Sequence, residues 1–539
     1  MLTLAPALHI KKWVREHTTQ VRSHQTVMTN HFFQQIRDAM SGRESRTFLE
    51  TLSGVSWTYA DVAALSARYA SALVELGLEA GDRVAVQVEK SPEALMLYLG
   101  AIRAGAVFLP LNPAYTNAEL DYFLGDAEPT ILICDLVRRA GLAPVAARAK
   151  VRSLETLGPD GQGSLRDRSD ASVPHFKDAP RGPDDLAAIL YTSGTTGRSK
   201  GAMLTHGNLA SNAEVLATLW RFSPADVLLH ALPIYHTHGL FVAVNTLLLS
   251  GGKILFLPKF DSTQCLALMP RATTMMGVPT FYTRLLRHEN LSRESTAHMR
   301  LFISGSAPLL EETHRAWFER TGHVILERYG MTETNMTTSN PYDGERKAGT
   351  VGFPLPGVSL RLVDPETGAF LGQAETGVIE VKGPNVFRGY WRNPEKTAAE
   401  FRSDGFFITG DLGKIDESGY VHILGRAKDL IISGGFNVYP KEVEAEIDAL
   451  AGVIESAVIG LPHGDFGEGV AAIVVPAPGA SLDEQAVQDA LSKNLAKFKL
   501  PKRVIFVDEL PRNAMGKVQK NLLRETFRDL FGSRPDDYP

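Results

Sequence analysis

Residues 191–204 read YTSGTTGRSKGAML, a stretch rich in glycine and hydroxyl side chains that also carries Arg198 and Lys200. The apolar run LAAIL stands just before it, as expected for a buried strand. Small residues after a strand let backbone N–H groups approach a polyanion, and a lysine adds a compact positive charge. The pattern therefore predicts a loop that holds phosphate groups, with a nucleotide as the ligand.

This loop differs from the commoner phosphate motif G-x-x-x-x-G-K-[ST]. Ser199 stands five residues after Gly194, and the chain has no Gly-Lys-Ser/Thr triplet. A kinase or ATPase of that class is therefore disfavoured. A flexible Gly/Ser/Thr linker is the plainer alternative, but both flanks of the loop are apolar rather than polar.

Six stretches, in chain order, resemble the successive motifs of the adenylate-forming superfamily of acyl-CoA synthetases, luciferases and peptide-synthetase adenylation domains. They are the phosphate loop SGTTGRSKG, ISGSAPL (303–309), ERYGMTET (327–334), FFITGDLG (406–413), GRAKDLIISGGFNVYP (425–440) and PRNAMGKVQK (511–520). The resemblance covers residues 28–539. It implies an enzyme that uses ATP to join a carboxylic acid to coenzyme A (CoA) through an acyl-adenylate, releasing AMP and pyrophosphate.

The elements that must position these motifs alternate between strand-like and helix-like patterns, as in DRVAVQV, SPEALMLYLGAIRAG and AVFLPLN. This order is typical of βαβ units, which build parallel sheets covered by helices and bind ligands at the carboxyl ends of strands. Residues 157–185, rich in Gly, Pro, Asp and Ser, indicate a long surface connection. We therefore expect an α/β protein with a large N-terminal domain of βαβ-built sheets.

The pattern changes after Lys428, where a short amphipathic helix (442–450) precedes the strand-like runs ESAVIGL and AAIVVPA. A chain of 539 residues is also too long for one ordinary core. We expect a domain that binds AMP and the acyl group over residues 28–427, and a small mobile α+β domain over residues 428–539. The resemblance places the hinge at Lys428, about which the small domain rotates between adenylation and thioester formation. From the residues alone, an ordinary interdomain loop is an equally good interpretation.

Composition narrows the class of protein further. Hydrophobic residues make up 44% and charged residues 22% of the chain, and the net charge of −5 gives no sign of nucleic-acid binding. No apolar run approaches the ~18 residues of a membrane span, so we expect a soluble protein without stable membrane association. The two cysteines cannot form a disulfide framework, and Cys134 in ILICD is expected to be buried and inert. We predict a cytoplasmic location, with residues 1–27 as a disordered extension rather than a targeting segment.

Activation of a carboxylate by ATP brings two anions together and expels pyrophosphate, so the site needs cations and Mg²⁺. The resemblance implies a catalytic set of Lys517, His236, Thr332 and Glu333. In it Lys517 bridges the carboxylate and the α-phosphate, Thr332 contacts phosphate and Glu333 helps to hold Mg²⁺. A single carboxylate suits Mg²⁺, which keeps waters and uses phosphate oxygens. Without the resemblance, Lys517 would be a solvated lysine and Glu333 a residue at a helix N-terminus.

The resemblance also implies the contacts of the nucleotide. Asp411 is expected to accept hydrogen bonds from the ribose hydroxyls, and Arg426 to make a second contact; from its own context Asp411 is equally well a turn residue. The implied ATP-binding set is Thr192, Ser193, Gly194, Thr195, Thr196, Gly197, Lys200, Gly305, Ser306, Ala307, Glu327, Arg328, Tyr329, Gly330, Met331, Thr332, Asp411, Arg426 and Lys517.

The identity of the acid depends on Arg284, which lies in MGVPTFYTRLLRHE within a helix predicted to begin at Pro279. Most relatives line the acyl pocket with apolar side chains. At this position the resemblance to malonyl-CoA synthetases implies a guanidinium that grips the distal carboxylate of the substrate. The planar fork of arginine suits a carboxylate, and a buried charge needs such a partner. A solvated helix face is the alternative, since Arg287 lies one turn later.

The remaining substrate contacts follow from the same resemblance. His236, Ser306 and Met331 are expected to border the acyl group, whereas His238 is more readily a packed histidine. CoA is expected to pass between the domains along Ser433, Gly434 and Gly435, since glycines let the pantetheine approach the backbone. A tight turn is an equally good interpretation of this glycine pair.

The leading hypothesis is a malonate, or methylmalonate, CoA ligase with a small dicarboxylate as substrate. The alternative is a CoA ligase for another small, aromatic or fatty acid. An adenylation module that serves a carrier protein is disfavoured because no carrier or condensation segment follows the last motif. A non-catalytic binding protein is disfavoured because Lys200, Glu333, Asp411 and Lys517 are all present. The sequence leaves the oligomeric state open.

Overall fold

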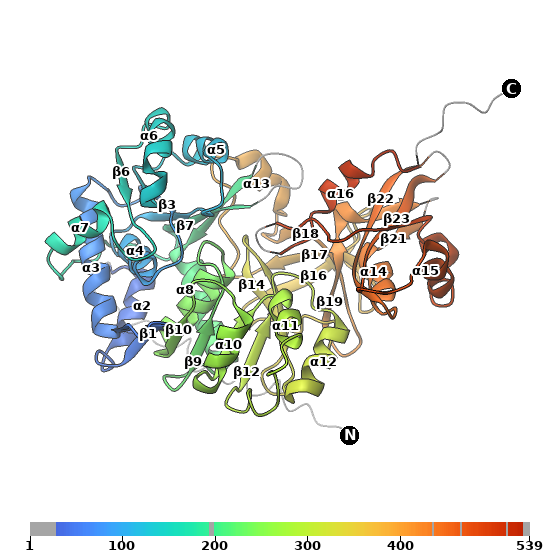
Figure 1. The fold of residues 1–539 in the computed structure, drawn as a ribbon. Coiled ribbons are helices and arrows are strands. Elements are labelled where there is room, and N and C mark those ends of the chain that lie inside the picture. Colours follow the sequence, from blue (N-terminus) through green and yellow to red (C-terminus); the bar gives the residue numbers. More distant parts are fainter. Residues whose placement is uncertain (1–28, 193–198, 434–435, 464–465, 514–515, 532–539) are drawn as a thin grey trace, which may run out of the picture.

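The computed structural model describes residues 29–192, 199–433, 436–463, 466–513 and 516–531. The expected extension, residues 1–27, lies outside the described residues. A large N-terminal domain of helices and sheets is followed by a smaller C-terminal domain, coloured orange to red in Figure 1. The predicted fold class, a large α/β domain with a small α+β domain, is confirmed. The boundary at Lys428 stays a prediction.

The first large sheet has six strands in the order β6-β5-β3-β4-β7-β8, all parallel except β8. Its strands are β3 (Arg83–Gln87), β4 (Val107–Pro110), β5 (Ile131–Cys134), β6 (Ser153–Thr156), β7 (Leu186–Thr192) and β8 (Lys200–Thr205). Its accompanying helices are α3 (Tyr59–Glu75), α4 (Pro92–Arg103), α5 (Asn117–Ala127), α6 (Arg139–Arg148) and α7 (Ser164–Ala171). The predicted βαβ unit is therefore present as β3, α4 and β4.

The second large sheet has nine strands in the order β15-β14-β13-β12-β11-β9-β10-β1-β2. These are β1 (Thr47–Thr51), β2 (Ser56–Thr58), β9 (Val227–His230), β10 (Lys253–Phe256), β11 (Thr274–Gly277), β12 (Leu301–Ser304), β13 (Leu326–Met331), β14 (Asn335–Ser339) and β15 (Phe353–Pro354). Strands β1 and β9 to β13 pair in parallel, so their carboxyl ends share one edge. The helices of this half are α2 (His31–Met40), α8 (His206–Leu219), η2 (His238–Val244), α9 (Asn245–Ser250), α10 (Ser262–Leu268), α11 (Pro279–Leu286) and α12 (Glu311–Thr321).

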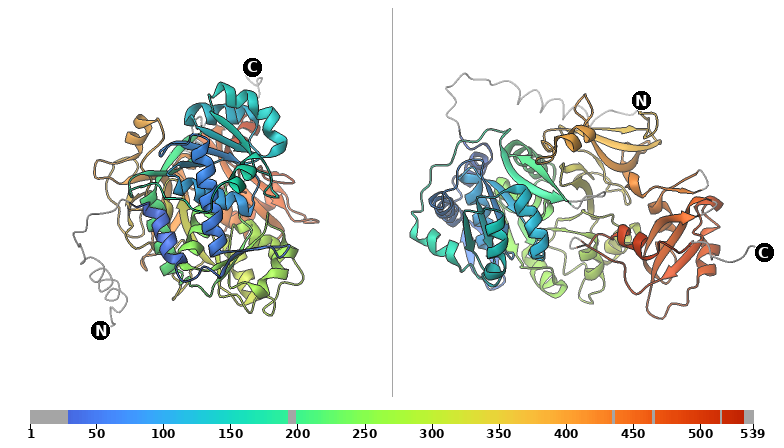
Figure 2. Two further views of the ribbon diagram at one scale, coloured as in Figure 1. Left: turned by 90° about the vertical axis from the view of Figure 1, so that its left-hand side faces the viewer. Right: turned by 90° about the horizontal axis from the view of Figure 1, so that it is seen from above.

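Two smaller sheets complete the molecule. An antiparallel sheet contains β16 (Ser359–Val363), β17 (Thr376–Lys382), β18 (Phe407–Ile415) and β19 (Val421–Arg426), with α13 (Pro394–Glu400) between β17 and β18. The short helix η4 (Ala427–Asp429) then leads into the C-terminal domain. That domain contains β20 (Ile431–Ser433), β21 (Phe436–Val438), α14 (Pro440–Asp448), β22 (Val453–His463), β23 (Gly467–Pro476), α15 (Glu484–Leu491), β24 (Arg503–Phe506) and α16 (Lys520–Thr526). Seen from above, the small sheet and the C-terminal domain lie at the same end of the molecule (Figure 2).

Local sequence explains several element boundaries. Helix α8 begins directly after β8 because Thr205 and Asn208 form a capping box, and such a cap contributes about 1 kcal/mol. Helix α14 begins at Pro440, two residues before the predicted start at Glu442, because proline suits the first turn of a helix. Cys134 is fully buried, and burial raises the pKa of its thiol to about 11, as the apolar run predicted.

The predicted connection over residues 157–185 contains a helix that its Gly, Pro, Asp and Ser content did not indicate. Helix α7 begins at Ser164, and the Arg68 guanidinium donates to the carbonyl oxygens of Ser169, Asp170 and Ser172 near its end. These contacts come from α3, far away in sequence. Tertiary hydrogen bonds therefore stabilise a helix that propensity alone does not indicate.

Candidate active site

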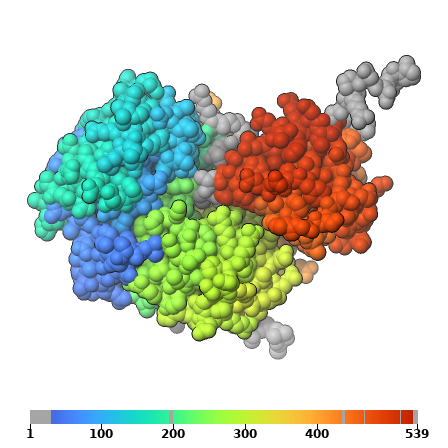
Figure 3. Space-filling view, viewed as in Figure 1, coloured from blue at the N-terminus to red at the C-terminus, as the bar shows by residue number. Residues whose placement is uncertain are grey.

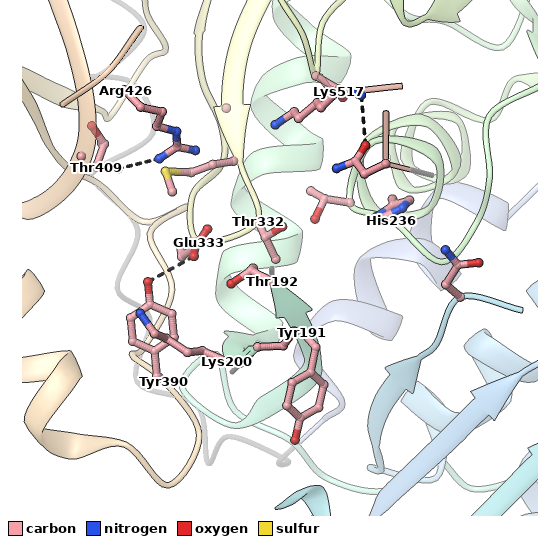
Figure 4. Close-up of a pocket in the computed structure, with 18 of the residues that line it drawn as sticks. Tyr191, Thr192, Lys200, His236, Thr332, Glu333, Tyr390, Thr409, Arg426 and Lys517 are labelled. Carbon is pink, nitrogen blue, oxygen red and sulfur yellow. Dashed lines mark hydrogen bonds between the residues drawn. The ribbon is translucent and has the colours of Figure 1, made fainter. Parts of the chain in front are cut away.

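A cavity of about 1250 Å³ lies where the large domain meets the C-terminal domain. Its wall comes from the ends of β7, β8 and β13, from β18 and β19, and from the C-terminal loop that carries Lys517. Figure 3 shows the C-terminal domain in red against the large domain. Figure 4 shows Lys517 and His236 on one side of this cavity, and Glu333, Lys200 and Tyr390 on the other.

One wall of the cavity carries a network of paired charges. Asp411 on β18 stands directly opposite Arg426 on β19 in the antiparallel register, and the two side chains form an ion pair of 2.8 Å. The Tyr329 hydroxyl donates to the other oxygen of Asp411, and Arg426 donates to the Thr409 carbonyl oxygen at 3.2 Å (Figure 4). The strand register thus fixes the guanidinium, which lines the cavity, whereas Asp411 lies behind it.

Glu333 follows the end of β13 and is only 5% exposed. The Tyr390 hydroxyl lies 3.1 Å from Glu333 and 2.6 Å from Glu400, both of which line the cavity (Figure 4). Lys200, at the start of β8, lies 4.0 Å from Glu400 and 5.2 Å from the centre of the Tyr390 ring. Burial raises the pKa of Glu333 and lowers that of Lys200.

Lys517 enters the cavity from the C-terminal domain on a tight loop. Its backbone N–H donates to the Asn513 side chain at 3.0 Å, and Gly516 before it has a φ of +73°, a conformation that favours glycine. The side chain meets solvent within the cavity, but surrounding protein still desolvates it. Desolvation first, and the nearby charge of Arg426 second, lower the pKa of Lys517.

The opposite end of the cavity carries unpaired polar groups. Ser306 lies 3.2 Å from Nδ1 of His238, while Nε2 of His236 and Nε2 of His238 have no hydrogen-bond partner among the described residues. Burial lowers the pKa of His236 to about 3, so this imidazole is neutral at pH 7. All three guanidinium nitrogens of Arg328, a residue only 2% exposed, also lack a partner among the described residues.

Arg328 can occupy this place because residue 305 is a glycine. A Cβ at Gly305 would lie 2.3 Å from an Arg328 nitrogen. Burial lowers the pKa of Arg328 to about 9, and burial raises the pKa of its neighbour Glu327 to about 7. Glu327 accepts a hydrogen bond from the Leu309 backbone at 3.1 Å rather than from Arg328. Arg328 is therefore a buried cation with no paired carboxylate in the part of the chain that the structure describes.

The structure brings most of the predicted residues together. The cavity is lined by Thr192, Lys200, His236, Ser306, Arg328, Gly330, Met331, Thr332, Glu333, Arg426, Lys428 and Lys517. Gly305, Ala307, Glu327, Tyr329, Asp411 and Ser433 are not among the lining residues. Ser193, Gly194, Thr195, Thr196, Gly197, Gly434 and Gly435 lie outside the described residues. The roles assigned to these residues stay predictions.

Arg284 differs from its expected environment. The helix begins at Pro279 as predicted, but Tyr282 and Leu285 form its buried face and leave Arg284 exposed on the other side. The expectation of a buried Arg284 is therefore wrong, and this residue does not line the cavity. Thr280, one turn earlier on the same face, lies near Gly516 beside Lys517. The substrate contact assigned to Arg284 stays a prediction.

Sequence reasoning missed Tyr390, Glu400 and Lys396, which complete the wall around Glu333. Tyr390 follows β17 and Glu400 ends α13, so no motif spacing connects them with β13. The only sequence signal that could have pointed to these residues is the segment RGYWRNPEK, in which a Gly-Tyr pair precedes a helix that begins with proline.

Within the described residues, no helix is both long and apolar enough to span a membrane. A search of the same residues finds no group of three or more His, Cys, Asp or Glu side chains able to hold a metal ion by themselves. The carboxylate of Glu333 in the cavity wall fits Mg²⁺, which takes oxygen ligands and obtains most of them from phosphates and water.

Comparison with known proteins identifies the family. The AMP-binding enzyme model matches residues 36–391, and the AMP-binding enzyme C-terminal domain model matches residues 442–517. ATP-bound MatB from Rhodopseudomonas palustris is 63% identical with a TM-score of 0.92, over 94% of this chain and 100% of that chain; the TM-score to apo MatB is 0.82. A malonate–CoA ligase of Arabidopsis thaliana is 35% identical over 83% of this chain and 79% of its own length. A feruloyl-CoA synthase of Amycolatopsis sp is 36% identical over 88% and 94%, respectively.

These findings confirm the predicted relationship to the adenylate-forming enzymes and the predicted enzyme class, an AMP-forming acid–thiol ligase. The first range contains the phosphate loop and the motifs at 303–309 and 327–334, and the second reaches Lys517 in the last motif. The chain belongs to the AMP-binding enzyme family.

Proposed function

We propose that this enzyme joins malonate to CoA through malonyl-adenylate, using ATP with Mg²⁺ and releasing AMP and pyrophosphate. The observation that carries the choice of acid is the unpaired guanidinium of Arg328 at the cavity wall. A buried cation without a partner is costly, and a second carboxylate on the substrate would satisfy it. A monocarboxylic acid would leave it unpaired.

The arrangement of neighbours supports this assignment. His238, Ser306 and Arg328 lie at one end of the cavity. There the charge of Arg328 adds to burial in lowering the pKa of Lys517, and the charge of Lys517 adds to burial in lowering the pKa of His236. A small acid can therefore present its distal carboxylate to Arg328 and its reacting carboxylate to Lys517. The charges of Arg328 and Lys517 make this end of the cavity positive, as a dianion requires.

Adenylation follows from the charges around the nucleotide. Lys517 neutralises the incoming carboxylate and the α-phosphate as they approach, and Lys200 faces the departing pyrophosphate. Arg426, fixed by Asp411, orients the nucleotide from the other wall. Mg²⁺, held on the protein side by Glu333, supplies further positive charge to the phosphates when it is bound.

Thioester formation requires a different face of the C-terminal domain. We infer that rotation about Lys428 withdraws Lys517 and brings Ser433, Gly434 and Gly435 to the cavity, so that CoA reaches the adenylate. The C-terminal domain carries Lys517 on a loop and Ser433 on a strand that starts just after η4. A rotation of that domain would therefore replace Lys517 by Ser433 at the cavity.

We also propose that the enzyme is cytoplasmic.

Other acids are alternatives to malonate. Methylmalonate has the same pair of carboxylates and differs by one methyl group, so Arg328 does not discriminate against it. Feruloyl and long-chain acids are favoured only by relatives of modest identity, and neither offers an anion to Arg328.

A screen of pyrophosphate release tests the proposal. Purified enzyme with ATP, Mg²⁺ and CoA is given malonate, methylmalonate, succinate, propionate, octanoate and ferulate in turn. We expect the highest kcat/KM with malonate or methylmalonate. Preference for propionate, octanoate or ferulate over malonate would refute the dicarboxylate assignment.

A further inference from the structure

One hydroxyl group serves two carboxylates in the wall of the cavity. The Tyr390 hydroxyl oxygen lies 3.1 Å from Oε1 of Glu333 and 2.6 Å from Oε2 of Glu400. A phenol has a single proton to donate, so it can satisfy only one of two ionised carboxylates at a time. The three groups therefore form one unit, in which a change at one carboxylate alters the hydrogen bond at the other.

The surroundings hold Tyr390 firmly. It is 5% exposed, its ring packs edge-on against Phe387 at 4.9 Å, and its backbone N–H donates to the Thr397 hydroxyl at 2.9 Å. A ring fixed in this way cannot follow a moving carboxylate. Its hydroxyl thus defines where Glu333 must lie to receive the bond.

Glu400 connects the same unit to the phosphate-facing lysine. Its Oε1 lies 2.6 Å from Lys396 and 4.0 Å from Lys200. Lys200 also lies over the Tyr390 ring, at 5.2 Å from its centre. Glu400 therefore sits between the hydroxyl that contacts Glu333 and the lysine that begins β8 after the phosphate loop.

We propose that Tyr390 and Glu400 are positioning residues that orient Glu333 and Lys200 as one unit, and so set the affinity for the Mg²⁺–nucleotide complex. A cation on Glu333 leaves the Tyr390 proton to Glu400, and Glu400 in turn keeps Lys200 directed toward the phosphates. This inference rests on the proposed role of Glu333 in holding Mg²⁺. It does not depend on which acid is the substrate.

Tyr390→Phe and Glu400→Gln separate these contributions. Tyr390→Phe removes only the hydroxyl and keeps the ring beneath Lys200, and Glu400→Gln removes the charge at nearly constant shape. Loss of a group that orients a metal ligand typically weakens metal binding by about 10-fold or more. We expect each variant to weaken binding of Mg²⁺ with α,β-methylene-ATP by about 10-fold, and the double variant to lose little more than either, since all three groups share one hydrogen-bonded unit.

The measurement is calorimetric titration of the nucleotide analogue with and without Mg²⁺, without any acid present. Tyr420→Phe is the matched control, because that hydroxyl donates to the Glu345 carbonyl oxygen at 2.8 Å and Tyr420 does not line the cavity. It should bind the analogue as the wild type does. Thermal unfolding checks that every variant is folded.

The proposal would be overturned by any of three results. These are wild-type affinity of Tyr390→Phe for the analogue with Mg²⁺, strictly additive losses of affinity in the double variant, and equal losses of affinity with and without Mg²⁺. Because these titrations contain no acid, they keep their meaning even if malonate proves not to be the substrate. A wild type that binds the analogue equally with and without Mg²⁺ would refute the role of Glu333 itself.

Discussion

The two ends of the cavity differ in whether their arginine has a carboxylate partner. At the end proposed to bind the nucleotide, Arg426 is paired with Asp411, which also accepts a hydrogen bond from the Tyr329 hydroxyl. At the end proposed to bind the acid, Arg328 is more deeply buried than most arginines and lysines in proteins, yet no described residue pairs with it. A paired cation is already positioned before its ligand arrives, whereas an unpaired buried cation makes the protein depend on an anion from outside.

The largest effect is expected at the residue that both ends share. Lys517→Ala should lower the rate of adenylation by about 100-fold or more, because it removes a preorganised charge from the transition state. Thioester formation from preformed malonyl-adenylate should be spared, since the proposed rotation withdraws Lys517 from the cavity before that step. Rapid-quench assays of the two half-reactions measure this, with the exposed Lys493→Ala as control. Equal damage to both half-reactions would contradict the rotation.

Arg328→Met tests the unpaired end directly. The KM for malonate should rise by about 100-fold, because a substrate carboxylate loses its buried partner. The unfolding temperature should stay the same or rise, since an unpaired buried charge is removed.

The paired Arg300, which lies 2.6 Å from Asp226, provides the contrast for that variant. Arg300→Met should lower the unfolding temperature, because it leaves Asp226 without its partner, and should not change the KM for malonate. Steady-state kinetics measure the malonate KM of both variants, and thermal melts measure their unfolding temperatures. An unchanged malonate KM in Arg328→Met would remove the distinction between the two ends.

A smaller effect is expected at Arg284, which is exposed. Arg284→Ala should raise the KM for malonate by at most about 5-fold, because Arg284 lies outside the cavity wall and its charge reaches the substrate only through solvent. The KM for ATP should not change. Arg287→Ala, one turn later and also exposed, is the matched control and should be silent. A rise in malonate KM as large as that expected for Arg328→Met would contradict the assignment of the distal carboxylate to Arg328.

The smallest effect is expected in the pH dependence of adenylation, which tests the ionisation states of Lys517 and Glu333. Lys517 acts in its charged form, and its pKa is lowered from 10.5, so adenylation should fall as pH rises through this lowered pKa. Glu333 must be ionised to hold Mg²⁺, and its pKa is raised from 4.5, so activity should also fall as pH drops through that raised pKa. Pyrophosphate exchange measured across pH should thus show both limbs. An alkaline limb at or above 10.5 would contradict the desolvation of Lys517.

Short-range patterns predicted much of the fold. The strand before the phosphate loop, the βαβ unit around α4 and the helix from Pro279 are all present, because apolar periodicity and proline position act locally. Helix α7 was missed because contacts from Arg68 stabilise it. The cavity residues named from motifs came together, but Tyr390 and Glu400 were missed because the loop after β17 and α13 reach Glu333 only through folding.

By itself the sequence determined the family and the set of chemical groups, since ordered motifs specify which loops carry lysine, glutamate and glycine. Only the tertiary structure decided which arginine is buried. The sequence alone does not distinguish the environments of Arg284 and Arg328. Arg284 lies on the exposed face of α11, whereas Arg328 is buried on β13 beside Gly305. Burial depends on what packs around a side chain, and those neighbours come from distant parts of the chain.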